Sequence, residues 1–158
     1  MLCRIFLIMV TACSIAKSCE CSESTVEQSR DRAEVVFRGT IIALRDTKTP
    51  SKIGGRVHDL KKVAVFRVTR VWKGDVGETF EMPAVEETSM CTGFWPTFLK
   101  IGNDLVIYAR RFKGQPEYYT DICTRTMPAS DAAKFKDFDK LGPGEEPAKR
   151  KSSGKDSK

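Results

Sequence analysis

Cysteines carry the clearest chemistry that this sequence offers. An even set of four follows an amino-terminal segment with the pattern of a secretory signal, and such a set in an exported chain predicts two disulfide bonds. The four are Cys19, Cys21, Cys91 and Cys123. Cys19 and Cys21 are one residue apart, too close to pair comfortably with each other, so each is expected to bond to a distant partner. Such bonds would hold the amino terminus rigidly against the rest of the domain.

Residues 1–18 are expected to be a signal peptide. Arg4 precedes an apolar run over 5–10, and small residues follow. This run is shorter than the roughly 20 apolar residues that a membrane span needs, and no other stretch comes close. Removing the segment takes away Cys3 and Cys13 and lowers the formal net charge from +6 to +4 by removing two basic residues. We therefore expect a secreted, extracellular protein without a membrane span.

Three processing sites remain open. Cleavage after Ser18 gives a chain that begins at Cys19. Cleavage after Ala16 is equally acceptable and leaves two residues, the first of them Lys17, in front of the cysteine. A third interpretation takes the residues up to Cys13 as a bacterial lipobox, with a lipid anchor on that cysteine. For a bacterial protein these outcomes correspond to the periplasm or to a lipid-anchored surface.

The domain that must position the cysteines is expected to span 19–141. Its pattern is that of strands with a short helix at each end. The expected strands are 33–44, 62–72, 79–82, 104–112 and 117–123. Gly39, inside the first of them, is expected to mark a bulge or a sharp bend. Five strands are the number of an OB-fold-type barrel, so the fold class is all-β with flanking helices.

Helix signals flank the expected barrel. Ser24 and Glu27 have the spacing of a capping box, which predicts a helix that runs to about residue 32. Ser130 is expected to cap a closing helix, and Gly142 can end it. The apolar residues expected on one face of this helix are Phe135, Phe138 and Leu141.

Two polar segments outside the barrel are candidate contact surfaces. Residues 142–158 contain no apolar residue larger than alanine and are expected to form a disordered basic tail. Its cluster of Lys149, Arg150 and Lys151 is a candidate contact for an anionic surface or polysaccharide. The connection 45–61 is long for a compact domain, and loops of this length are often binding loops.

The residues that most enzymes need are scarce. His58 is the one histidine and lies in the polar connection, so a Ser-His-Asp relay or a histidine-containing zinc site has little to build on. No glycine-rich phosphate loop follows a strand. We therefore expect no enzyme and no cofactor. Nucleic acid is not an expected partner, because the chain is exported and only slightly basic.

Several segments together resemble a known family. They are the Cys-x-Cys start, VFRGT at 36–40, FRVTRVWKG at 66–74, the Cys91 loop with Phe94 following, DLVIYAR at 104–110, and Cys123 after the last strand. In this order, over about 19–130, the sequence resembles the amino-terminal OB-fold domain of the tissue inhibitors of metalloproteinases (TIMPs) and the wider netrin-like (NTR) domains. The style of the strand segments is similar to that of secreted bacterial members.

The resemblance implies inhibition of a zinc metalloendopeptidase. In these inhibitors the free amine and the carbonyl of the first cysteine chelate the protease zinc, and the second residue enters the specificity pocket. Carried over, Cys19 would bind the partner's zinc, Glu20 would enter the pocket, and the residues around Cys91 would lie alongside. The expected protease contacts are Cys19, Glu20, Cys21, Met90, Cys91 and Thr92.

Some features remain open under this interpretation. The disulfide pairing that we favour is Cys19 with Cys91 and Cys21 with Cys123, among the three pairings that four cysteines allow. Glu20 stands where the family has a small residue, and a carboxylate is costly to bury in an apolar pocket. The alternative function is a non-inhibitory extracellular binding or adhesion module, which contacts proteins or polyanions through the loop 45–61 and the basic tail.

Overall fold

The structure is a computed structural model that describes residues 19–47, 51–53, 56–58, 62–85 and 91–149. The expected signal peptide, with the three candidate processing sites, lies outside the described residues. So do Met90 and, in the basic cluster, Arg150 and Lys151.

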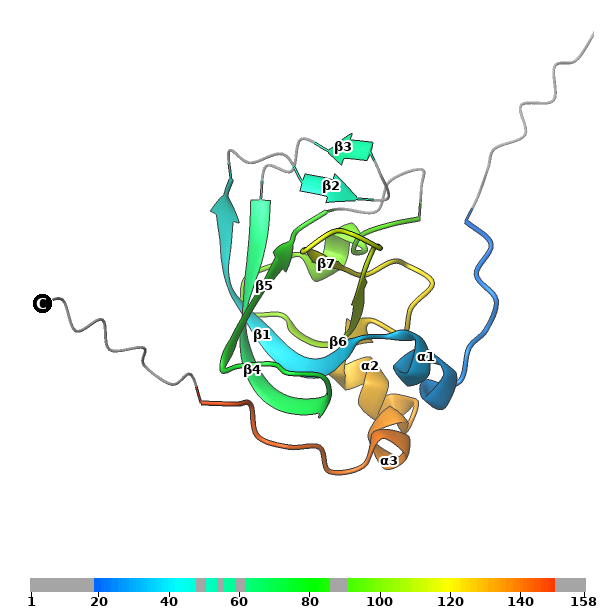
Figure 1. Ribbon diagram of the computed structural model, residues 1–158. Helices are drawn as coiled ribbons and strands as arrows, with labels where there is room; N and C mark the ends of the chain where they lie inside the picture. Colours follow the sequence, from blue (N-terminus) through cyan, green and yellow to red (C-terminus); the bar gives the residue numbers. More distant parts are fainter. Residues whose placement is uncertain (1–18, 48–50, 54–55, 59–61, 86–90, 150–158) are drawn as a thin grey trace, which may run out of the picture.

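A nearly closed antiparallel barrel forms the body of the molecule (Figure 1). Its strands are β1 (Val35–Asp46), β4 (Lys62–Lys73), β5 (Thr79–Pro83), β6 (Asp104–Arg111) and β7 (Tyr118–Tyr119). They are paired in the order β5-β4-β1-β6-β7. The two ends of this order meet where the rings of Phe80 and Tyr118 lie 5.2 Å apart. The predicted five-stranded OB-fold-type barrel with flanking helices is thereby confirmed.

Glycine permits the bend that closes the barrel. The pairing of β1 with β4 shifts register between Arg38 and Gly39, because Thr69 is an extra residue on β4. A Cβ atom at Gly39 would lie 3.2 Å from the Cβ of Phe66, closer than almost all such contacts. The predicted bulge is confirmed, and it increases the local twist of the two long strands.

Two apolar clusters fill the molecule. The barrel interior holds large side chains with almost no exposure, among them Phe37, Ile41, Phe66, Phe94 and Ile107. A second cluster, which includes Val36, Val106 and Tyr108, packs between the barrel and the helices. Adjacent residues of one strand therefore face different clusters, as the alternation of a strand requires. The helices that flank the barrel are thus part of the core.

The first helix begins one residue later than the sequence predicted. In α1 (Val26–Arg32) the N-cap is Thr25, whose hydroxyl accepts a hydrogen bond from the Gln28 amide at 3.2 Å. The Thr25 amide in turn donates to the side-chain oxygen of Gln28 at 3.1 Å, which completes a capping box. Ser24 instead pairs with the Ser29 hydroxyl at 2.8 Å. The expected box of Ser24 and Glu27 is therefore wrong.

The closing helix is two short helices instead of one. These are α2 (Ala129–Lys134) and α3 (Asp137–Leu141), separated by Lys136 in the left-handed conformation with φ 57°. The break turns Phe135 outward, where it is 67% exposed, while Phe138 packs against the second cluster. The expectation of one continuous apolar face that includes Phe135 is therefore wrong.

Of the two predicted ends of this helical segment, the start at Ser130 is wrong and the end at Gly142 is confirmed. Ser130 does not cap α2, because Pro128 holds the N-cap position. Gly142 does end α3: its φ is 77° and its amide donates to the Phe138 carbonyl at 2.9 Å. A left-handed C-cap of this kind favours glycine.

Residues 142–149 continue along the barrel beyond α3 (Figure 1). The Trp72 indole N–H donates to the Gly142 carbonyl at 2.9 Å. The amide and carbonyl of Val71 both bond to the backbone of Glu145, at 2.9 and 2.7 Å. The expected disordered tail is therefore wrong for 142–149, because backbone pairing holds the segment even though it buries little apolar surface.

The long connection 45–61 also has regular structure. β1 extends into it as far as Asp46, which pairs with Lys62. A hairpin of β2 (Ser51–Ile53) and β3 (Arg56–His58) follows, at the end of the barrel opposite the helices (Figure 1). Short elements complete the structure: β8 (Met127–Pro128), paired with β6, and the 3-10 helix η1 (Pro96–Phe98). No helix among the described residues is long and apolar enough to cross a membrane.

Candidate functional site

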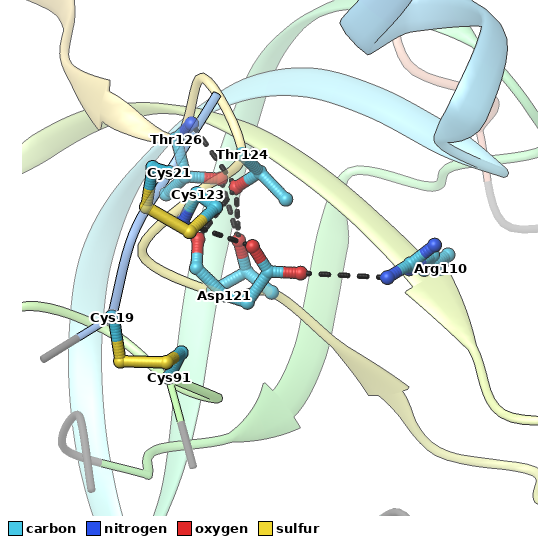
Figure 2. The surroundings of a disulfide bond; sticks show 9 residues. Cys19, Cys21, Cys91, Arg110, Asp121, Cys123, Thr124 and Thr126 are labelled. Carbon is cyan, nitrogen blue, oxygen red and sulfur yellow. Dashed lines mark hydrogen bonds and ion pairs between the residues drawn. A yellow bond between two sulfur atoms is a disulfide. The ribbon is translucent and has the colours of Figure 1, made fainter. Parts of the chain in front are cut away.

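Two disulfides fasten the amino-terminal segment to the barrel (Figure 2). They join Cys19 to Cys91 and Cys21 to Cys123, so the favoured pairing is confirmed. The sequence separations are 72 and 102 residues. By loop-closure entropy each bond stabilises the fold by about 4 kcal/mol, an upper figure because the two loops overlap.

The disulfides gather the predicted contact residues on one edge of the molecule. We call this edge the cysteine ridge, and it consists of Cys19, Glu20, Cys21, Cys91 and Thr92. Glu20 and Cys21 are exposed, and the other three residues are partly exposed. The predicted contact residues therefore lie together, except for Met90, which is outside the described residues. A ridge of this kind presents backbone atoms on a rigid support.

Backbone hydrogen bonds hold the Cys91 side of the ridge. Thr92 and Asp121 form an antiparallel bridge. The Ile122 amide donates to the Cys91 carbonyl at 3.1 Å. Cys91 itself has φ 62°, a left-handed conformation that costs about 1–2 kcal/mol for a residue other than glycine. The bridge and the disulfide therefore fix a backbone shape that an isolated loop would avoid.

Threonine hydroxyls support the turn that carries Cys123. The Thr120 hydroxyl lies 2.9 Å from that of Thr124 and 2.7 Å from that of Thr126. The Thr126 hydroxyl accepts from the Tyr108 amide at 2.9 Å, which anchors the turn to β6. Because of this turn, the expected fifth strand over 117–123 is regular only at Tyr118–Tyr119. Sequence reasoning missed the network, and its only signal is the close spacing of three threonines.

Asp121 shapes the same turn from inside (Figure 2). Its carboxylate accepts from the Cys123 amide at 2.9 Å, and its carbonyl accepts from the Thr124 hydroxyl at 2.8 Å. The other carboxylate oxygen lies 3.6 Å from an Arg110 nitrogen. An aspartate that bonds two residues ahead is a turn-forming device. It orients Cys123 toward its disulfide partner.

An ion pair connects the segment behind the ridge to the helices. The Arg125 guanidinium donates to the Ser24 carbonyl at 3.0 Å. It also makes a two-point contact with Asp137, at 2.9 and 2.6 Å. Asp137 is only 1% exposed, and its hydrogen bonds raise the pKa of Arg125 above the usual value. This pair, which the sequence did not reveal, ties α3 to the segment that follows Cys21.

A pocket of about 340 Å³ lies behind the ridge. Its lining includes Ser24, Arg32, Tyr108, Arg110 and Cys123. The Tyr108 hydroxyl is buried and has no hydrogen-bond partner among the described residues, and burial raises its pKa well above the usual value. Within the same described part of the chain, no group of three or more His, Cys, Asp or Glu residues is placed to hold a metal ion.

No protein-family model matches the chain, and no curated protein is significantly similar to it.

Proposed function

We propose that this protein is a secreted, TIMP-like protein-binding module that inhibits zinc metalloendopeptidases through Cys19. The observation that carries the proposal is the cysteine ridge, in which Glu20 and Cys21 are exposed while two disulfides fix the segment to Cys91 and Cys123. A binding edge that is rigid before association loses little entropy when it binds.

The chemistry of the proposal lies in the backbone of Cys19. After removal of residues 1–18, its α-amine and carbonyl oxygen would be two donors on one residue, suited to chelate a single metal ion. A catalytic zinc keeps one coordination position open for water, and a ligand held there blocks hydrolysis. A metal ligand must be deprotonated, so the amine would bind in its neutral form and release a proton when it meets the zinc. The zinc belongs to the protease, and this chain contributes only ligands.

Glu20 gives the proposal a preferred kind of target. Its side chain is exposed on the ridge, next to the residue that would bind the zinc. Burying a carboxylate in an apolar pocket costs several kcal/mol unless a partner charge compensates. The proteases best suited to this ridge therefore have a polar or positively charged pocket beside the zinc.

One added residue tests the proposal. We expect a chain that begins at Cys19 to inhibit members of a panel of zinc endopeptidases, and the same chain with one alanine in front to lose potency by orders of magnitude. The extension turns the amine into an amide, which removes a zinc ligand without touching the disulfides. A chain with one alanine added after Lys158 is the matched control and should inhibit normally. Equal potency of both extended chains would contradict the proposal.

The non-inhibitory binding module is the second candidate. It is favoured by the β2–β3 hairpin, which lies at the end of the barrel away from the helices (Figure 1). A module of this kind would bind its partner equally well with or without the alanine before Cys19. If binding instead depends on low salt and on residues 149–158, the basic tail carries it.

A further inference from the structure

A second surface, separate from the cysteine ridge, has the features of a ligand site. Two cavities of about 420 and 780 Å³ adjoin on the outside of the barrel and share Arg38, Asp104 and Phe138 in their linings. We call them together the arginine groove. Its walls come from β1, β4, β6, α2 and α3, with shorter contributions from β8 and η1, and no residue of the cysteine ridge lines it.

The bulge in β4 brings two arginines together in this groove. Arg38 pairs directly with Arg70 across the strands, and the extra residue Thr69 lies between Arg70 and the next pair. All three line the first cavity. A bulge changes the direction of the side chains next to it. Like charges directly opposite each other on a sheet are destabilising. A pair of opposed arginines therefore favours an anionic group between them.

The groove only partly neutralises these charges. Arg38 donates through two nitrogens, at 2.9 and 2.6 Å, to one oxygen of Asp104. The Phe138 ring lies 5.8 Å from the same guanidinium and helps to hold it in place. Arg70 makes no ion pair in the described part of the chain, although the 142–149 segment runs beside it: a Cβ atom at Gly144 would lie 2.8 Å from the Arg70 Cγ. One positive charge thus remains available to a ligand.

The rest of the groove suits hydroxyl groups. Its wider cavity is lined by the polar side chains of Thr97, Asn103 and Ser130 and by the carboxylates of Asp104 and Asp131. The side chains of Asp104 and Asp131 are 34% and 40% exposed, so both carboxylates are within reach of a ligand. A carboxylate accepts hydrogen bonds and repels another anion, so these two favour a neutral donor, such as a sugar hydroxyl, over a second anionic group. A ligand that is negatively charged throughout would therefore fit only one end of the groove.

We propose that the arginine groove binds an acidic polysaccharide, with a uronate carboxylate at Arg38 and Arg70 and sugar hydroxyls along the wider cavity. A guanidinium matches a planar carboxylate with two parallel hydrogen bonds, so uronates suit this site. Binding here is independent of the ridge, so the protein could act on a protease while attached to a carbohydrate matrix.

Titration with alginate oligosaccharides, which are polymers of uronates, tests the proposal. Arg70→Ala is expected to weaken binding about ten-fold, the effect of losing a charge-assisted hydrogen bond. Arg70→Lys keeps the charge but loses the planar fork, so it should recover only part of the affinity. The matched control is Lys113→Ala, which also removes one exposed positive charge. Asp104 begins β6, whereas Lys113 lies just after its other end. It should bind as the parent protein does.

Several results would overturn the proposal. Equal weakening by Lys113→Ala and Arg70→Ala would show non-specific attraction by net charge. Competition by poly-glutamate as strong as that by alginate would assign the groove to acidic peptides. Loss of alginate binding on deletion of residues 150–158 would assign it to the basic tail. The chain with one alanine before Cys19 should bind alginate normally, which keeps this outcome distinct from any failure of protease inhibition.

Discussion

Removal of Arg125 is the most informative test of how the ridge is supported. Its guanidinium donates hydrogen bonds both to Ser24, behind the ridge, and to Asp137, in α3. Asp137 is 1% exposed and the side chain of Arg125 is 24% exposed, so the pair is largely shielded from water. Arg125→Leu would leave a buried carboxylate without a compensating charge.

The expected loss can be worked out from this burial. Breaking one partner of a buried ion pair costs about 3–5 kcal/mol of unfolding free energy. Loss of the bond to the Ser24 carbonyl adds about 1 kcal/mol. For a domain of this size 1 kcal/mol corresponds to about 3–5 °C, so a total loss of about 4–6 kcal/mol should lower Tm by roughly 12–30 °C. Urea and thermal unfolding followed by circular dichroism measure both quantities.

A second substitution isolates the charge. Arg125→Leu combined with Asp137→Leu removes both ions, and replacement of a buried pair by apolar residues is often close to neutral. The double variant should therefore be more stable than Arg125→Leu alone. A loss below about 1 kcal/mol in the single variant, or simple additivity in the double variant, would refute the role assigned to this pair.

Three further predictions concern other parts of the fold. Tyr108→Phe should raise the unfolding free energy by about 1 kcal/mol, because it removes a buried hydroxyl without a partner. Because the pKa of Tyr108 is raised in the folded protein, this tyrosine ionises first in the unfolded chain. The parent protein should therefore lose stability as the pH rises above about 10, and Tyr108→Phe should lose less. Urea unfolding at pH 7 and pH 11 measures both effects. Gly74→Ala should cost about 2 kcal/mol or more in urea unfolding, since φ is 82° and a Cβ would lie 2.6 Å from the Glu34 carbonyl oxygen. A chain that ends at Lys149 should unfold like the full chain, whereas one that ends at Leu141 should lose about 2–4 kcal/mol with its hydrogen bonds to β4; equal stability of the two would contradict this pairing.

The barrel was predictable because its signals are local. Apolar alternation placed four of the strands to within about two residues, and Gly39 marked the bulge. The fifth strand ended early because the hydroxyl of Thr120 bonds within a turn. The helix break at Lys136 could not be predicted, because lysine has no particular preference for the left-handed backbone conformation that it adopts here.

The candidate site was predictable only in its covalent part. Cysteine count and spacing indicated the disulfides and the exposed residues between them. The supporting contacts join distant residues: Arg125 and Ser24 are 101 positions apart in sequence. Arg38 and Asp104, in the arginine groove, are 66 apart. Such pairs leave no pattern in a single sequence, since either partner alone is an ordinary polar residue.

The mass of the naturally exported protein, measured intact with and without reductant, tests the central claim most directly. We expect a chain that begins at Cys19 and gains four hydrogen atoms on reduction, two for each disulfide. The nitrogen of Cys19 would then be an α-amine, the group that the proposal assigns to zinc. A chain that begins at Lys17, or one that carries lipid on Cys13, would contradict the account, because the Cys19 nitrogen would be locked in a peptide bond.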